Sequence, residues 1–137
     1  MKLNPKKCVF GVRSGKFLGF MVSERGIDAN PDKVKAILDL QEPKTIRDVQ
    51  KLTGRMAALT RFISKSADKA LPFFQALRGN KKFEWGEIQK KAFVEVQNHL
   101  HGLPTMARPE VGEVLQMYIS ASDNTVASVL TIERGIL

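Results

Sequence analysis

Lysine and arginine side chains recur on one face of the segment 45–65. At roughly 100° per residue, five of them fall within a sector of about 120° on a helical wheel, opposite an apolar stripe. They are Arg47, Lys51, Arg55, Arg61 and Lys65. Gly54 lies in the same sector, and a glycine within a helix costs about 1 kcal/mol relative to alanine. The pattern is typical of a surface that neutralises phosphates and lets their backbone come close, although a solvated basic face with a tolerated glycine has the same appearance.

Asp123 is the acidic residue whose position best suits metal chemistry. It follows an apolar run, where a carboxylate can begin a turn or coordinate Mg²⁺ in a site that cleaves phosphodiesters. One carboxylate cannot hold two metal ions, and Glu133 is the only acidic residue after it. Cys8, His99 and His101 do not have the spacing of zinc ligands. Nucleotide-binding and hydrolase sequence motifs are absent.

The overall charge favours a polyanionic partner. The sequence carries 22 basic and 14 acidic side chains, a net charge of +8. Residues 1–102 contain twenty basic and ten acidic side chains, whereas residues 103–137 contain two and four. A single cysteine indicates a reducing compartment, and no apolar run reaches the roughly 18–20 residues of a membrane span. We therefore expect a soluble intracellular protein, cytoplasmic or nuclear, that does not contact membranes.

The residues before 30 predict a β-hairpin. Two short apolar runs flank Ser14-Gly15, and a second turn signal at 24–26 closes the second run. This is the pattern of a strand, a turn and a strand. Gly19 then falls inside the second strand, where a glycine often marks a bulge or the close approach of another backbone.

Four helices are predicted in the middle of the chain. Asn30-Pro31 begins a helix over about 31–40, and Thr45 with Asp48 forms a short capping box for a helix over 45–65. Further helices are expected over 66–77 and 86–101. Their expected buried rows are Leu71, Phe74 and Leu77 in the first, and Ile88, Ala92, Val96 and Leu100 in the second.

The C-terminal residues predict a second pair of strands, over about 114–120 and 125–132. No helix or further strand is present to cover this hairpin, so it is expected to open a domain that continues elsewhere. The sequence therefore predicts an α+β fold with segregated parts. A β-hairpin comes first, helices form the middle, and a second β-hairpin comes last.

Three ordered runs then carry a resemblance over essentially the whole chain. They are LNPKKCVFGVRSGKFLGFMVSERGIDANPDKVKAI, TIRDVQKLTGRMAALTRFISKSADKALPFF and FEWGEIQKKAF. Together they resemble the Pol polyproteins of Ty3/gypsy LTR retrotransposons, and most of all those of plants. The parent of such a segment is an RNA-directed DNA polymerase with RNase H activity that uses Mg²⁺.

The resemblance implies a division of the chain. Residues 1–30 match the end of the reverse transcriptase palm, 31–82 the thumb, 83–109 a connection, and 110–137 the start of an RNase H-like domain. Phe17, Leu18, Gly19 and Phe20 match the primer grip, and Asp123 matches the first metal-binding aspartate of the RNase H-like domain. The palm aspartates and the other RNase H carboxylates have no match here, so the segment is expected to be inactive alone and to bind no cofactor.

Two functions remain open at this stage. The first is a segment that holds an RNA/DNA or DNA primer-template duplex within the rest of the Pol polyprotein, with contacts from residues 17–20, the five basic residues and Gly54. The second is a non-enzymatic helical module whose basic face binds an acidic protein.

Overall fold

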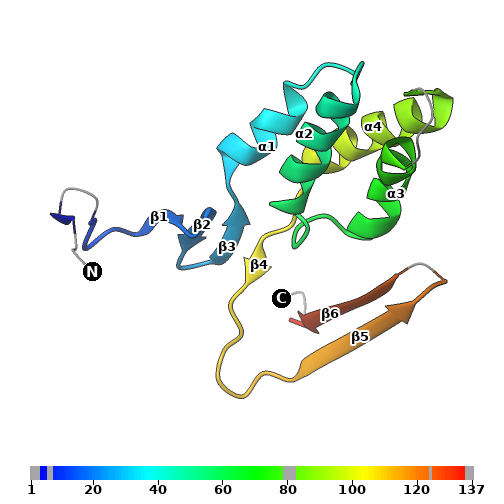
Figure 1. Ribbon diagram of the computed structural model, residues 1–137. Coiled ribbons are helices and arrows are strands. Elements are labelled where there is room, and N and C mark those ends of the chain that lie inside the picture. Colours follow the sequence, from blue (N-terminus) through cyan, green and yellow to red (C-terminus); the bar gives the residue numbers. More distant parts are fainter. Residues whose placement is uncertain (1–3, 6–7, 79–82, 124, 135–137) are drawn as a thin grey trace.

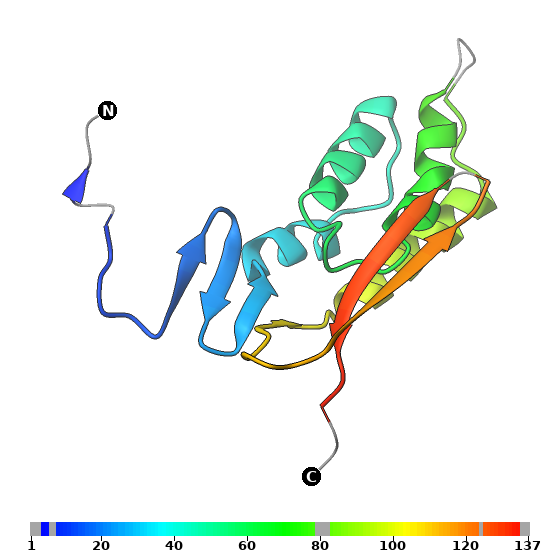
Figure 2. The ribbon, with the colours of Figure 1, turned by 90° about the horizontal axis from the view of Figure 1, so that it is seen from below.

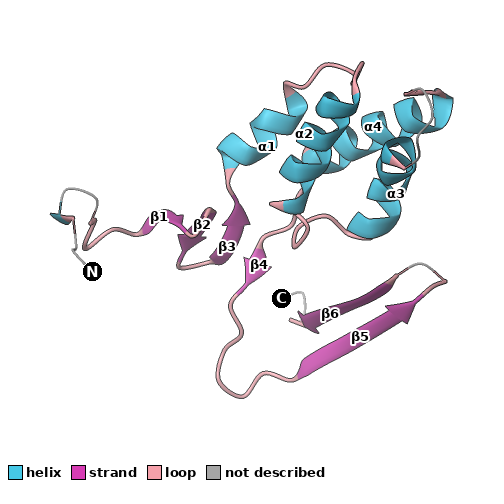
Figure 3. Ribbon diagram, in the orientation of Figure 1, coloured by secondary structure: helices cyan, strands magenta, loops and turns pink. Residues whose placement is uncertain are grey.

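The computed structural model describes residues 4–5, 8–78, 83–123 and 125–134. Four helices form one group beside a small sheet, and a separate β-hairpin lies below them (Figure 1). Figure 3 shows the same segregation by element type, with helices gathered on one side and strands in two places. The prediction of a mixed α+β fold is confirmed.

The first sheet is an antiparallel meander with one late addition. It contains β1 (Ser14–Phe17), β2 (Phe20–Ser23), β3 (Gly26–Ala29) and β4 (Met106–Ala107), in that spatial order. The register pairs Phe17 with Phe20, and Gly26 with Ala107. The last pair joins residues about eighty positions apart in the chain, and sequence patterns alone did not predict it.

The first turn of this meander lies elsewhere than predicted. Ser14 and Gly15 belong to β1, and the chain reverses at Leu18-Gly19. Both turn residues have positive φ, 48° and 83°, which is the backbone of a two-residue turn matched to the twist of paired strands. Gly19 is therefore a turn residue rather than a bulge within a strand.

Helices α1 (Pro31–Leu38) and α2 (Ile46–Ala57) begin where their capping residues predicted. The Asn30 side chain accepts a hydrogen bond from the Asp32 backbone N–H at 2.9 Å. At the start of α2, the Thr45 hydroxyl accepts from the Asp48 N–H at 3.2 Å, and Asp48 accepts from the Thr45 N–H at 3.1 Å. Each cap satisfies backbone donors that the first turn leaves unpaired.

Helix α2 ends earlier than predicted, at Ala57. Residues 58–65 form a series of turns, in which the Leu59 N–H donates to Met56 O and the Phe62 N–H donates to Leu59 O. Leu59, Phe62 and Ile63 are nevertheless buried. The three- and four-residue spacing of apolar side chains therefore continues beyond the end of α2, because the turns that follow also place them in the core.

Helices α3 (Ser66–Leu77) and α4 (Glu87–Leu100) complete the core. In α3 the buried aromatic residue is Phe73, fully enclosed, whereas Phe74 is about half exposed. In α4 Ile88 is exposed and Phe93 is buried. The predicted buried rows of α3 and α4 were thus partly wrong, because the neighbouring helices cover the face next to the predicted one. Twelve buried residues make up the core: Ile37, Val49, Leu52, Met56, Leu59, Phe62, Ile63, Ala70, Phe73, Phe93, Val96 and Leu100.

The second sheet is the hairpin of β5 (Leu115–Ala121) and β6 (Val126–Ile132), close to the predicted bounds. It lies below the helices with its tip toward α3 (Figures 1 and 2). At the tip, the Thr125 hydroxyl donates to Asp68 Oδ1 at 3.4 Å. At the base, Arg134 donates to Glu113 and to the Arg108 carbonyl oxygen. Its side chains are mostly exposed.

Candidate nucleic-acid interface

The turn between β1 and β2 presents two apolar side chains to solvent. Phe17 is 64% exposed and Leu18 79% exposed. Phe20, directly opposite Phe17 in the register, is instead partly buried against the core, and its ring centre lies 6.0 Å from that of Phe62. Leu18 also has φ 48°, a backbone that residues other than glycine seldom adopt and that the surrounding structure must maintain. The structure thus divides the four predicted residues into an exposed tip and an anchor, Phe20, on the helical core.

A groove of about 490 Å³ runs between α1 and α2. Its lining combines three small residues, three cations, an amide and one carboxylate, which is paired with Lys16: Ala36, Gly54, Ala58, Lys33, Lys51, Arg55, Gln50 and Asp32. A methyl group added at Gly54 would meet no neighbouring atom within 4 Å. Small residues beneath cations give a phosphate backbone both space and charge, as electrostatic binding of nucleic acid requires.

Arg55 also ties the two sides of the groove together. Its Nη1 donates a hydrogen bond to the backbone carbonyl oxygen of Ala36, in the last turns of α1. A guanidinium carries five donors, so this contact leaves others directed to solvent. Arg55 therefore links α2 to α1 while contributing charge to the groove.

Arg47 and Lys51 are one helical turn apart on the exposed side of α2. Lys51 faces the groove, and Arg47 lies nearer the helix start. The Thr45 hydroxyl, which donates to Asp48, lowers the pKa of that carboxyl below its usual value. Asp48 therefore stays ionised in the capping box, and one negative charge lies among these cations.

Arg61 and Lys65 do not belong to the α2 face, because the helix ends before them. Arg61 instead lies beside the β1–β2 turn, with its Cζ 6.0 Å from the centre of the Phe20 ring. Lys65 has a left-handed backbone, φ 51°, and precedes α3 as its N-cap. The predicted continuous face of five basic residues is therefore wrong: three lie on α2, one joins the hairpin turn, and one starts the next helix.

Lys33 is the basic residue that sequence reasoning missed. It lines the groove, and its Nζ lies 5.8 Å from the centre of the Phe20 ring. It thus connects the turn with the helices. Its sequence signal is a cation in the first turn of a helix, where acidic residues are normally favoured.

Asp123 lies in the turn after β5 and is exposed. Over the described ranges, no group of three or more His, Cys, Asp or Glu side chains is arranged to hold a metal ion. Mg²⁺ takes six oxygen ligands and is usually held by one or two carboxylates together with waters and substrate phosphates. The role of Asp123 as a metal ligand stays a prediction. In the same described part of the chain, no helix is long and apolar enough to cross a membrane.

Comparison with known proteins gives two kinds of similarity, while no family model matches the chain. Over 129 residues it is 24% identical to the transposon Tf2-3 and Tf2-4 polyproteins of Schizosaccharomyces pombe. The aligned part is 94% of this chain but 10% of each relative. The chain therefore spans about a tenth of the length of the curated relatives that it matches.

The fold matches part of a solved viral enzyme. A foamy viral protease-reverse transcriptase in complex with double-stranded DNA superposes with a TM-score of 0.72 and 16% identity, covering 87% of this chain and 21% of that one. Its complex with an RNA/DNA hybrid gives a TM-score of 0.71 at 16% identity, covering 88% and 17%. The chain is thus similar in sequence to a segment of Tf2 retrotransposon polyproteins and has the fold of part of a protease-reverse transcriptase.

Proposed function

We propose that this chain is the segment of a Ty3/gypsy-type Pol polyprotein that holds a primer-template duplex. Residues 1–30 would end the reverse transcriptase palm, 31–82 would form the thumb, 83–109 a connection, and 110–137 the start of an RNase H-like domain. The plant-like character suggested by the three sequence runs belongs to this proposal as well.

The observation that carries the proposal is the basic groove beside an exposed hairpin tip. Lys33, Lys51 and Arg55 line a groove together with small residues, and the tip lies next to Lys33. The solved proteins of this fold contain double-stranded DNA or an RNA/DNA hybrid. Contacts of this kind go to phosphates and do not depend on base sequence.

We propose further that the segment binds but performs no chemistry alone. Two-metal phosphodiester cleavage needs several carboxylates around its ions, and Asp123 by itself would supply one ligand. If Asp123 serves in the parent protein, it would hold one Mg²⁺ together with carboxylates from elsewhere. Polymerase and RNase H activities would then belong to the assembled polyprotein.

Binding to a short fluorescent RNA/DNA hybrid, measured by anisotropy at several salt concentrations, tests the proposal. With Lys33, Arg47, Lys51 and Arg55 each neutralising one phosphate, the slope of log affinity against log salt should be about −3 to −4. Lys51→Gln should weaken binding to all sequences alike and make the slope shallower by about 1.

Lys91→Gln is the matched control, because Lys91 is an exposed lysine on α4, outside the groove. It should leave the slope unchanged. An affinity that does not vary with salt, or an equal effect of both substitutions, would contradict the proposed interface. Binding of an acidic protein without binding of the hybrid would favour a protein-interaction module.

A further inference from the structure

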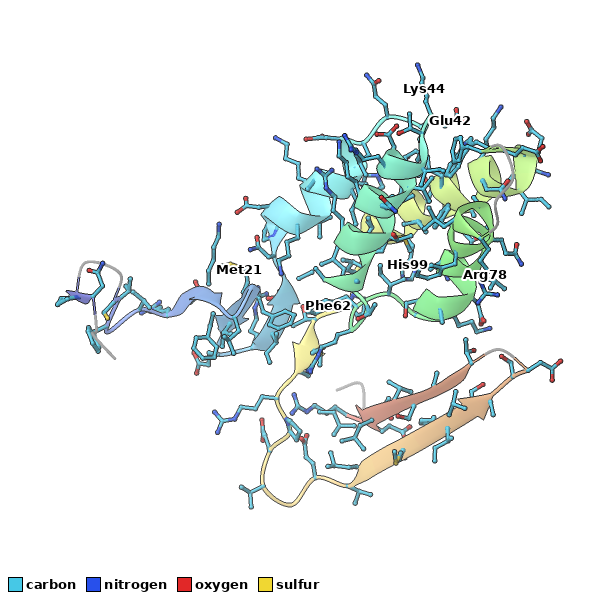
Figure 4. The ribbon with its side chains drawn as sticks, in the orientation of Figure 1. Met21, Glu42, Lys44, Phe62, Arg78 and His99 are labelled. Carbon is cyan, nitrogen blue, oxygen red and sulfur yellow. The ribbon has the colours of Figure 1, made fainter. Side chains whose placement is uncertain are left out.

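Two cations lie at the Phe20 ring, where the β1–β2 turn meets the helices. Lys33 Nζ is 5.8 Å from the ring centre and Arg61 Cζ is 6.0 Å from it. Phe20 packs on Phe62, which is labelled in Figure 4 where the helices approach the sheet. Two positive charges from segments that are distant in sequence therefore both lie within about 6 Å of the centre of one ring.

Neither cation is neutralised within the part of the chain that the structure describes. Lys33 and Arg61 form no ion pair there within 4 Å. The nearest acidic residue in sequence, Asp32, is already paired with Lys16. Two cations at one ring without a neutralising carboxylate create a positive potential there, and a bound anion would lower it.

The backbone around Lys33 adds to this positive potential. Lys33 lies in the first turn of α1, after Asn30 and Pro31. The N-terminal end of a helix carries a partial positive charge that disfavours cations and favours anions. A lysine at this position slightly destabilises the helix, so helix stability does not explain why a lysine is present here.

Gly19 leaves the space that Lys33 occupies. A Cβ built on Gly19 would lie 2.5 Å from Lys33 Nζ and 3.3 Å from its Cε. The missing side chain at the turn thus lets the ammonium lie over the turn itself. The positive φ of Gly19, 83°, favours glycine there whether or not a nucleic acid backbone comes close.

From these contacts we infer that Lys33 and Arg61, held at the Phe20 ring, form a binding site for one phosphate group of a nucleic acid strand. The inference rests on the proposed duplex function and adds a specific subsite to it. The site lies between the hairpin tip and the α1–α2 groove, and Lys33 belongs to both. One strand could therefore run from the tip into the groove with a phosphate contact at the junction.

The test compares two double variants that remove the same charge. Lys33→Gln/Arg61→Gln removes the site. Lys35→Gln/Lys91→Gln is the control, because Lys35 lies on α1 away from the groove, beside Leu100 and His101, and Lys91 is on α4. With a short RNA/DNA hybrid, the site variant should show a salt slope shallower than that of the control by about 1. Equal slopes would overturn the inference.

Two further measurements distinguish loss of the phosphate site from unfolding of the variant and from failure of the proposed duplex binding. Lys33→Arg/Arg61→Lys keeps both charges and should keep the wild-type slope, which a merely structural role does not require. Inorganic tripolyphosphate should raise the thermal unfolding midpoint of the wild type and of the control variant, but not that of the site variant. If the wild type binds no duplex, the proposed function fails, and the tripolyphosphate comparison alone decides on the site: an equal shift in both double variants overturns it.

Discussion

The helical region and the β5–β6 hairpin are stabilised in opposite ways. The helices and the first sheet share a core of twelve buried residues, to which Phe20, Ile27 and Ala29 add from the strands. The hairpin pairs seven residues of each strand in continuous register but contributes no residue to that core. Met117, Ile119 and Leu130 are each more than half exposed.

Backbone pairing between strands and burial of apolar side chains therefore contribute separately to the stability of this protein. A two-stranded hairpin is at best marginally stable in water without a covered face. In this hairpin, the contacts that add to the strand pairing are polar and lie at its two ends. Arg134 and Glu113 close the base, and Thr125 contacts Asp68 at the tip.

Removing a large core side chain should produce the largest difference between the two regions. Phe73 is fully buried and stacks on Trp85, with ring centres 5.8 Å apart. Phe73→Ala should lower the free energy of unfolding by about 3–5 kcal/mol, through lost burial and the cavity left behind. Urea denaturation followed by circular dichroism measures this loss.

The matched substitution in the hairpin is Ile119→Ala, at a residue 69% exposed. Its effect should stay within about 0.5 kcal/mol, as for other surface positions. Comparable losses at Phe73 and Ile119 would mean that the hairpin face is covered in solution, and the contrast between the regions would disappear.

The junction of β3 and β4 gives the next largest effect. Gly26 has φ 138°, and a Cβ there would lie 2.1 Å from the backbone oxygen of Met106. Gly26→Ala should separate these strands and cost about 2–3 kcal/mol, because both the strained backbone and the clash oppose a side chain. Hydrogen exchange of the Met106 and Ala107 amides would report the loss of pairing.

Gly15→Ala is the control for this substitution, in the same sheet. Its Cβ would meet only Val12 Cγ2 at 3.9 Å, an ordinary contact, and its φ is not positive. Stability should change little. If Gly26→Ala and Gly15→Ala lowered the stability equally, the loss would come from replacing a glycine, and the β3–β4 pairing would add nothing to it.

The features that the sequence predicted well depend on neighbouring residues. Asn30-Pro31 and the Thr45–Asp48 capping box fix two helix starts through contacts within four residues. The bounds of β5 and β6 follow from β-branched and alternating residues in the same way. Each signal lies next to the boundary that it determines.

The features that were missed depend on distant contacts. Ser14-Gly15 and Leu18-Gly19 both resemble turns, and the packing of Phe20 on Phe62 accompanies the second. Likewise, Leu59 and Ile63 keep a helical spacing because turns can bury them as well as a helix can. The positions of Lys33 and Arg61 at the Phe20 ring depend on segments that meet only in the folded chain.

Acid should open the hairpin base while the helical core stays folded, which is the smallest and most local of these effects. The hydrogen bonds from Arg134 lower the pKa of Glu113 from its usual 4.5 to about 2. Because the folded pKa is the lower one, the stabilisation from this carboxylate is fully present well above pH 4.5 and is lost as pH falls toward about 2. Amide chemical shifts of the hairpin, followed by NMR from neutral to acid pH, should move over that window before those of α2 and α4 change.

The control for this prediction is Glu113→Gln, which removes the charge at every pH. The amides at the hairpin base of this variant should therefore already resemble the acid form at neutral pH. Simultaneous change in hairpin and helices, or an unchanged base in Glu113→Gln, would mean that burial rather than this ion pair holds the hairpin closed.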